Sequence, residues 1–229
     1  MNITIKDLYK SYKINKNLQQ NVLKGINLEI KQGEFCAIIG PSGSGKTTLL
    51  NLLGCIDRPD SGSIYFDEQE ITKLKERQLI HIRRDTIGYI FQFFNLIPTL
   101  TAFENTQMPF WYAKSKERSK YIDNLSRLYK EIGIYELKHR YPKQLSGGQQ
   151  QRVAIARALA NFPKFILADE PTGNLDSVNT KEIIELMKRE SKSLGASFLV
   201  ATHDLSLLSY FDKVITLKDG SIESISINN

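Results

Sequence analysis

Residues 40–47, Gly-Pro-Ser-Gly-Ser-Gly-Lys-Thr, combine a flexible backbone with a cation and a hydroxyl group. Because Gly43 and Gly45 have no Cβ, the backbone can curl there and point its N–H groups at phosphate oxygens. Lys46 is suited to the β- and γ-phosphates of a nucleoside triphosphate, and the Thr47 hydroxyl is suited to Mg²⁺. The spacing predicts a phosphate-binding loop, which is expected to comprise Gly40, Pro41, Ser42, Gly43, Ser44, Gly45, Lys46, Thr47 and Thr48.

Two carboxylates, Asp169 and Glu170, directly follow the apolar residues 165–168. We expect Asp169 to hold Mg²⁺ through water, since this ion keeps much of its hydration shell in proteins. Glu170 is then left to polarise the water that attacks the phosphate. A charged pair after an apolar run can also be a solvated strand end, but the following residues 171–176, Pro-Thr-Gly-Asn-Leu-Asp, argue against that interpretation. The pair therefore predicts hydrolysis of the bound triphosphate.

Regular elements must position these groups. Residues 34–39 are expected to form a buried strand, and residues 47–53 begin an apolar-periodic helix. A strand, a glycine-rich loop and a helix in this order make the phosphate loop credible, and the positive N-terminal end of the helix faces the same anion. We expect further strands at residues 3–8, 28–30, 165–168, 197–201 and 214–217, and helices at residues 150–160 and 181–194.

This alternation of strands and helices predicts an α/β fold, with a P-loop NTPase core whose mostly parallel sheet is covered by helices on both faces. Residues 3–8 and 28–30 are expected as edge strands, and residues 62–67 after a turn indicate a small antiparallel β patch. Residues 102–139 are helical and charged, which indicates an inserted helical subdomain. We expect one domain over residues 1–229, with residues 1–91 and 160–229 as the core and about residues 92–159 as the subdomain.

The composition limits the classes of protein that fit. No run of roughly 18 apolar residues is present, so we expect no membrane span, and residues 1–6 do not resemble a signal peptide. The net charge is +6, but the bases at residues 73–84 and 114–120 are interleaved with acids, which is typical of solvated helix faces. We therefore expect no nucleic-acid partner. Cys36 and Cys55 are expected to be buried thiols in the core.

A third motif, Leu-Ser-Gly-Gly-Gln at residues 145–149, lies between the phosphate loop and the two carboxylates. The three motifs in this order resemble the ATP-binding cassette (ABC) ATPases, and the resemblance covers essentially the whole chain. It implies an ATP-binding and ATP-hydrolysing subunit of an ABC transporter, with ATP and Mg²⁺ as its ligands. It also implies a separate integral-membrane permease as partner, and a peripheral location on the cytoplasmic face of the bacterial inner membrane.

The resemblance implies roles for further residues. Tyr12 is similar to the aromatic residue that stacks on adenine, with Tyr9 as the competing position, and Gln92 resembles the glutamine that joins Mg²⁺ and its water. His203 resembles the histidine that contacts the γ-phosphate, and Asp176 resembles the aspartate that communicates across a dimer. The expected catalytic residues are Lys46, Gln92, Glu170 and His203, and the expected metal-binding residues are Thr47, Gln92 and Asp169.

The Leu-Ser-Gly-Gly-Gln motif makes chemical sense in a dimer. Ser146 and the N–H groups of Gly147 and Gly148 are expected to lie ahead of a helix beginning near Gln149, another helix-end anion site. In this family the motif closes on the ATP held by the opposite subunit, so the resemblance implies a homodimer joined head to tail by two ATPs. Hydrolysis then removes the shared γ-phosphate contacts and releases the dimer.

Residues 53–57, 91–105 and 167–177 resemble one branch of this family, the ATPase subunits of lipoprotein-release and macrolide-export systems, which includes antimicrobial-peptide resistance systems. In this family the permease selects the transported substrate. Six of the eight residues from Phe93 to Leu100 are apolar, yet Asn95, Pro98 and Thr99 break helical and strand periodicity. We expect a partly exposed loop here that receives the permease.

Two other classes of protein share parts of this pattern. Soluble ABC ATPases act on ribosomes with two cassettes in one chain, or on DNA with a long coiled-coil insertion, and this chain shows neither feature. Other P-loop enzymes, such as kinases and GTPases, do not account for residues 145–149 or for His203. The sequence therefore favours the transporter ATPase over both.

Overall fold

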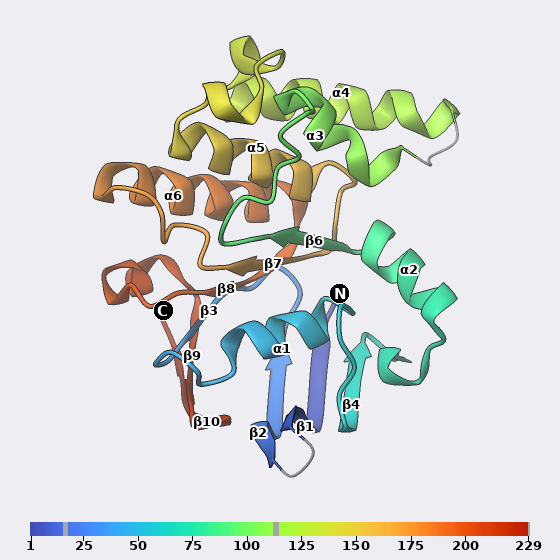
Figure 1. Cartoon of the computed structure of the whole chain (residues 1–229), viewed down its shortest axis with the longest axis vertical. Helices are drawn as coiled ribbons and strands as arrows, with labels where there is room; N and C mark the ends of the chain where they lie inside the picture. The colour runs from blue at the N-terminus through green and yellow to red at the C-terminus, as the bar shows by residue number, and fades with distance from the viewer. Residues whose placement is uncertain (16–17, 112–114, 229) are drawn as a thin grey trace.

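The computed structural model of the chain describes residues 1–15, 18–111 and 115–228. In these residues the larger sheet has six strands in the order β10-β9-β3-β8-β7-β6, and it crosses the middle of the molecule (Figure 1). The strands from β9 to β6 are parallel, which confirms the mostly parallel sheet, and β10 pairs antiparallel with β9 at one edge. The strands are β3 (Phe35–Ile39), β6 (Ile87–Ile90), β7 (Phe165–Asp169), β8 (Ser197–Ala201), β9 (Lys213–Lys218) and β10 (Ser221–Ile227).

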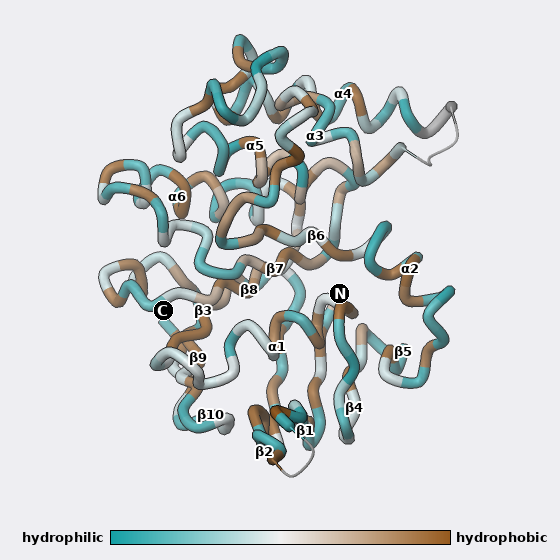
Figure 2. Tube along the Cα trace, viewed as in Figure 1, coloured by the Kyte–Doolittle hydropathy of each residue, from teal (hydrophilic) through white to brown (hydrophobic). Residues whose placement is uncertain are grey.

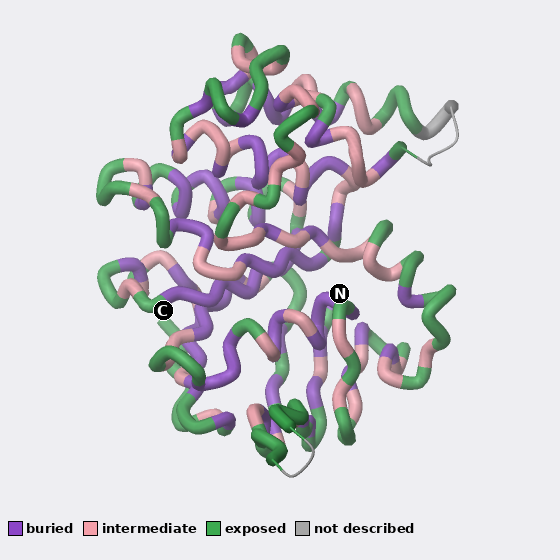
Figure 3. Tube along the Cα trace, in the orientation of Figure 1, coloured by how far each residue is buried: buried purple, intermediate pink, exposed green. Residues whose placement is uncertain are grey.

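Helices cover both faces of this sheet, as the sequence predicts. Along β3, Phe35 and Ala37 belong to the core on the side of α5 (Gly147–Leu159) and α6 (Ser177–Leu194). Cys36 and Ile38 belong to the opposite core, beneath α1 (Lys46–Leu53). Successive side chains of a strand point to opposite faces, so a strand buried on both sides must be apolar throughout. The central strands β3, β7 and β8 are accordingly mostly brown in Figure 2 and buried in Figure 3.

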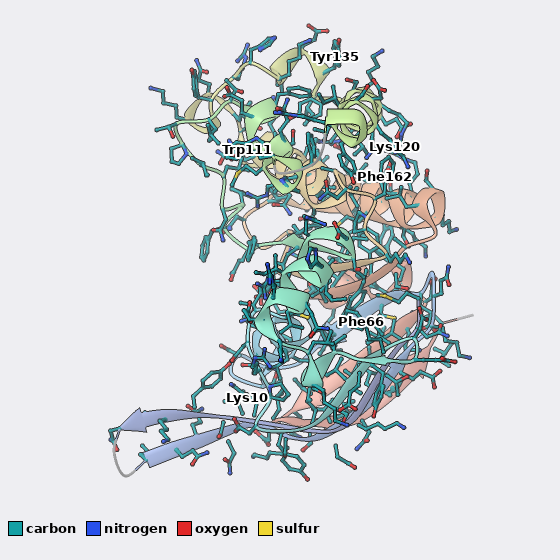
Figure 4. All side chains as sticks on the ribbon, turned by 90° about the vertical axis from the view of Figure 1, so that its right-hand side faces the viewer. Lys10, Phe66, Trp111, Lys120, Tyr135 and Phe162 are labelled. Carbon is teal, nitrogen blue, oxygen red and sulfur yellow. The ribbon has the colours of Figure 1, made fainter. Side chains whose placement is uncertain are left out.

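A second sheet is antiparallel, with the strand order β2-β1-β4-β5. Its strands are β1 (Ile3–Asn15), β2 (Leu18–Ile30), β4 (Ser61–Phe66) and β5 (Gln69–Glu70). This confirms the antiparallel patch, and residues 28–30 belong to an edge strand as expected, although they are only the end of a long one. The expectation of an edge strand at residues 3–8 is wrong, because these residues lie in an interior strand. The outer halves of β1 and β2 carry mostly exposed residues without apolar alternation, which is why the sequence did not predict them. Figure 4 shows this hairpin projecting from the body.

The remaining helices are α2 (Glu76–Asp85), α3 (Ala102–Gln107) and α4 (Ser115–Glu131). Helices α3, α4 and α5 lie together at the top of Figure 1, and the described part of residues 102–139 contains no strand, as predicted. Most of the basic cluster at residues 73–84 lies on α2, which is largely exposed. Short 3₁₀ turns occur at Ile71–Lys73, Met108–Phe110, Tyr135–Leu137, Pro142–Gln144 and Leu205–Tyr210.

Two helices begin earlier than expected. Helix α5 begins at Gly147 rather than near Gln149, because Ser146 caps it, and α6 begins at Ser177 rather than at residue 181, because Asp176 caps it. The Asp176 carboxylate accepts hydrogen bonds from the backbone N–H groups of Val178 and Asn179 at 3.1 and 3.0 Å. The first residues after each cap are small or polar, so they carry no apolar periodicity. The sequence does not predict strand β10, because its residues are mostly exposed and show no buried apolar face.

Cys36 and Cys55 are both buried and free, as expected. Burial raises the pKa of the Cys55 thiol to about 11, so this group stays protonated at neutral pH. None of the helices in the described parts of the chain has the length and apolar character needed to cross a membrane.

Candidate active site

A cleft of about 590 Å³ lies where the long hairpin meets the loop between β3 and α1. It joins the two sheets, because its walls come from β1 and β2 on one side and from the strand ends of the large sheet on the other. Gln20 and Val22 of β2 also line it, although neither belongs to a motif that indicates nucleotide binding. The cleft is lined by Tyr12, Gln20, Val22, Gly40, Pro41, Ser42, Gly43, Gly45, Lys46, Thr47, Thr48, Gln92, Glu170 and His203.

The predicted phosphate loop forms a tight cradle at one end of the cleft. Gly40 and Gly45 have φ angles of 151° and 105°, and a Cβ on Gly40 would lie 2.0 Å from the carbonyl oxygen of Leu217. The Lys46 ammonium folds back over the loop, donating hydrogen bonds to the carbonyl oxygens of Gly40 at 2.8 Å and Pro41 at 3.1 Å. The Ser44 hydroxyl is buried and has no hydrogen-bond partner among the described residues. A buried polar atom without a partner fits a loop that receives a phosphate.

Asp169 ends β7 beside this cradle. Burial raises the pKa of the Asp169 carboxyl above its ordinary value, while a hydrogen bond with the Thr47 side chain and the nearby Lys46 ammonium act in the opposite direction. The hydroxyl of Thr47 and the carboxylate of Asp169 are therefore neighbours, and hard oxygen ligands of this kind suit Mg²⁺. Within the described residues, no group of three His, Cys, Asp or Glu side chains could hold a metal ion by itself. The arrangement fits an ion that keeps several waters.

Two polar side chains from separate segments meet at the carboxylate of Glu170. Its Oε2 lies 3.2 Å from His203 Nδ1 and accepts a hydrogen bond from Gln92 Nε2 at 3.4 Å. Glu170 has a left-handed backbone with φ of 43°, uncommon for a residue other than glycine, and its N–H donates to the carbonyl oxygen of Ala201 at 2.9 Å. This conformation directs the side chain into the cleft rather than along the strand. Such backbone strain is typical of functional positions.

The loop after Gln92 is clamped by a residue that the sequence did not single out. Phe94 and Asn95 both have left-handed backbones, with φ of 59° and 49°, and Arg157 of α5 donates hydrogen bonds to both of their carbonyl oxygens. The Arg157 guanidinium also lies over the ring of Phe91. Burial lowers the pKa of Arg157 to about 10. Arg157 therefore ties the helix that follows the Leu-Ser-Gly-Gly-Gln motif to the loop that follows Gln92.

We expect Arg157→Met to loosen this loop, because charge-assisted hydrogen bonds to carbonyl groups contribute about 1.5–3 kcal/mol each. Amide hydrogens of residues 91–97 should exchange at least about tenfold faster, as measured by mass spectrometry. The matched control is Arg152→Met on the same helix, since Arg152 pairs with Glu182 and does not contact the loop. Equal exchange rates in both variants would show that Arg157 does not hold the loop.

The Leu-Ser-Gly-Gly-Gln motif does not reach the cleft of its own chain. Ser146 is exposed and forms a capping box with Gln149: the Ser146 hydroxyl accepts from the Gln149 N–H at 3.3 Å, and Gln149 Oε1 accepts from the Ser146 N–H. Gly147 and Gly148 thus lie in the first turn of α5. Asp176 also lies outside the cleft, but it is close to the motif. Its carboxylate accepts a hydrogen bond from the Asn179 side chain, and Asn179 in turn packs against Gly148, where an added Cβ would lie 2.8 Å from Asn179 Oδ1.

Comparison with known proteins identifies the family. The family model described as ABC transporter matches residues 23–173, more than half of the chain. The chain belongs to the ABC transporter family. It is an ATP-binding ATPase of this family, as the order of its motifs predicts. The match spans the phosphate loop, the Leu-Ser-Gly-Gly-Gln motif and the two carboxylates.

Individual ABC transporter relatives place the chain in the predicted branch. It is 46% identical to the uncharacterized ABC transporter ATP-binding protein MJ0796 of Methanocaldococcus jannaschii, over 96% of this chain and 95% of that protein. It is 45% identical to the lipoprotein-releasing system ATP-binding protein LolD of Hyphomonas neptunium, over 88% of both chains. It is 42% identical to the macrolide export ATP-binding/permease protein MacB of Syntrophobacter fumaroxidans, over 96% of this chain and 31% of that protein.

A solved structure of MJ0796 confirms the ABC cassette fold. It is a dimeric post-hydrolysis state bound to ADP and phosphate, and it matches this chain with a TM-score of 0.86 at 43% identity, over 98% of both chains. The α/β architecture with helices on both faces of the sheet is therefore shared with a known ATP-binding cassette.

Proposed function

We propose that the chain binds ATP with Mg²⁺ in the cleft and hydrolyses it there to drive a permease. The observation that carries this proposal is the meeting of Gln92 and His203 on one carboxylate oxygen of Glu170, beside the phosphate loop. A carboxylate in this position can accept a proton from water, which is the role of a general base. Release of phosphate from ATP by the purified chain, measured with and without Mg²⁺, tests the proposal. A chain that binds ATP and releases no phosphate would overturn it.

The geometry supports a role for each predicted residue in and beside the cleft. The cradle formed by residues 40–48 binds the phosphates, with Lys46 placed for the β- and γ-phosphates. Thr47, Gln92 and Asp169 hold Mg²⁺, which neutralises phosphate charge when it is bound. Glu170 takes the proton, and His203 contacts the γ-phosphate. Tyr12 lines the cleft whereas Tyr9 does not, which favours Tyr12 as the residue that stacks on adenine.

We propose that the chain works as a homodimer joined head to tail. Ser146, which caps α5, is exposed, Gly147 is half-buried, and neither lines the cleft of its own chain, so the helix end that they form is accessible to a second chain. The dimeric state of the MJ0796 structure supports this arrangement. Asp176, next to the motif, would then couple the two nucleotide sites across the dimer.

The division of the chain follows the same proposal. Residues 1–229 act as one ATPase domain, in which residues 1–91 and 160–229 form the core and about residues 92–159 form a helical subdomain. The grouping of α3, α4 and α5 at one end of the molecule supports this division (Figure 1). Gln92 lies where the two parts meet, so a change at the γ-phosphate can be passed to the subdomain.

The segment from Phe93 to Leu100 is our proposed docking site for the permease. It has no helix or strand, Phe93 is 70% exposed, and Phe94 and Leu96 are half-buried. A neighbouring groove of about 540 Å³ adds Ile80, Ile87 and Met108 to this apolar surface. An apolar groove of this kind suits a short amphipathic helix. The names of the relatives support a permease of the export or lipoprotein-release type. The chain itself is proposed to lie peripherally on the cytoplasmic face of the bacterial inner membrane.

We expect Phe93→Asp to abolish recovery of an integral-membrane protein with the tagged chain from solubilised membranes, because a carboxylate would be desolvated in the apolar contact. The ATPase rate of the isolated chain should stay within about twofold of its original value, since surface substitutions of this kind change stability little. Phe94→Asp tests the same surface. Ile227→Asp on β10, also 70% exposed, is the matched control. Undiminished recovery with Phe93→Asp and Phe94→Asp would place the docking site elsewhere.

A further inference from the structure

Three side chains form a closed network at the base of the long hairpin. The Lys10 ammonium lies 3.0 Å from Asp57 Oδ1, and the Tyr12 hydroxyl donates a hydrogen bond to Asp57 Oδ2 at 2.8 Å. The same ammonium lies 4.9 Å from the centroid of the Tyr12 ring, and it donates a further hydrogen bond to the Arg58 carbonyl oxygen at 2.7 Å. Each member therefore contacts the other two. Figure 4 labels Lys10 at the root of the hairpin, on the side of the main body.

The network joins two parts of the chain that are far apart in sequence. Lys10 and Tyr12 belong to β1, whereas Asp57 lies in the turn between α1 and β4. Lys10 is only 9% exposed, so its charge needs the partners that it has. Although burial acts to raise it, the hydrogen bonds from Lys10 and Tyr12 hold the pKa of Asp57 below its ordinary value. Asp57 is therefore a carboxylate at neutral pH, and the network is intact there.

This arrangement fixes the orientation of the Tyr12 ring. A tyrosine side chain has two main rotatable bonds, and here the hydroxyl is anchored to Asp57 while the ammonium covers one ring face. Tyr12 is 39% exposed and lines the nucleotide cleft, so ring surface remains available to a ligand. A cation on one face of an aromatic ring also draws electron density away from the other face. That change favours stacking with an electron-rich heterocycle.

We propose that Lys10 and Asp57 are positioning residues that hold the Tyr12 ring against the base of the bound nucleotide and increase the preference of the cleft for purines. The inference rests on the proposed stacking of Tyr12 on adenine. Its chemistry is limited to the base, because the phosphates are held by the cradle formed by residues 40–48. Loss of either positioning residue should therefore weaken binding of the base and leave binding of the phosphates unchanged.

Isothermal titration calorimetry can test this inference by measuring dissociation constants for ATP, CTP and inorganic tripolyphosphate. Tripolyphosphate has no base and so reports on phosphate binding alone. We expect Tyr12→Ala to weaken ATP binding about tenfold, and Lys10→Met or Asp57→Asn to weaken it about threefold to fivefold. Tripolyphosphate affinity should not change in any of the three. The ratio of CTP to ATP dissociation constants should fall in the positioning variants, and Lys10→Arg should restore most of the ATP affinity.

Two controls keep the outcome interpretable. Lys73→Met breaks a pair of similar length, since Lys73 lies 2.7 Å from Glu70, at an exposed site outside the cleft. A single variant leaves its partner unpaired and can unfold for that reason. The double variant Lys10→Met with Asp57→Asn removes both charges together, so the positioning role can still be tested with it.

The outcomes separate the inference from the function on which it rests. If Tyr12→Ala leaves ATP affinity unchanged, Tyr12 does not stack on the base and the proposed role of Tyr12 fails. If Tyr12→Ala weakens ATP binding but neither Lys10→Met nor Asp57→Asn does, stacking stands and the positioning role is wrong. If tripolyphosphate binding weakens as much as ATP binding, the two residues act on phosphate or on the fold, and the inference is again overturned.

Discussion

Glu170→Gln is expected to bind ATP as tightly as the unmodified chain and to hydrolyse it at least about a hundredfold more slowly, the lower end of the effect of a general base. The amide has nearly the shape of the carboxylate, so Gln92 and His203 keep a neighbouring oxygen to contact. It cannot accept a proton from water, however. The variant should consequently accumulate as an ATP-bound dimer, because the step that separates the subunits is blocked.

Phosphate release and size-exclusion chromatography in ATP measure the two effects. Glu223→Gln is the matched control, since Glu223 lies on the exposed edge strand β10, pairs with Lys218 and does not line the cleft. Lys46→Ala should behave differently and lose ATP binding itself, because it removes the cation held over the phosphate loop. Near-normal hydrolysis by Glu170→Gln would remove Glu170 from the catalytic role.

Ser146→Arg is expected to leave ATP binding by the single chain intact while abolishing ATP-driven dimerisation and turnover. Ser146 is exposed and lies outside the cleft of its own chain, so an arginine there meets the nucleotide of the partner only. The substitution also removes a helix cap, which costs about 1 kcal/mol. Thr101→Arg controls for that cost, because Thr101 caps α3 through the same kind of box with Glu104.

Light scattering with and without ATP measures the dimer, and nucleotide titration measures binding. The Thr101→Arg chain should still dimerise. Mixing Ser146→Arg with Lys46→Ala chains should leave at most one competent site in each dimer. If Ser146→Arg hydrolysed ATP at the original rate as a monomer, the head-to-tail arrangement would be wrong.

The parts of the site that the sequence predicts are those whose chemistry lies in short local patterns. The phosphate loop is such a case, because its glycines are required by backbone angles within a few residues, and the structure shows those angles at Gly40, Gly43 and Gly45. The start of α5 also follows from a local pattern, because Ser146 and Gln149 are three residues apart, which is the spacing of a capping box. Apolar periodicity alone indicates a start near Gln149.

Other contacts depend on how distant segments meet. Arg157 lies more than sixty residues from the loop that it clamps, and Lys10 lies 47 residues from Asp57. Neither pairing follows a fixed spacing, and the residue type of Phe94 does not indicate its left-handed backbone, whereas asparagine, as at position 95, is enriched in this conformation. The outer half of β2, which brings Gln20 and Val22 to the cleft, is likewise defined only by its pairing with β1.

The cleft has its two walls on two different sheets, with Tyr12 on the antiparallel one and the phosphate cradle on the parallel one. A nucleotide that touches both walls adds contacts to a junction that the polypeptide makes through a shared apolar core and through hydrogen bonds such as that from the Lys24 N–H to the Gly220 carbonyl oxygen. By mass action, nucleotide at a hundred times its dissociation constant adds about 2.7 kcal/mol to the free energy of unfolding. The thermal stability of the protein then reports the nucleotide supply of its surroundings.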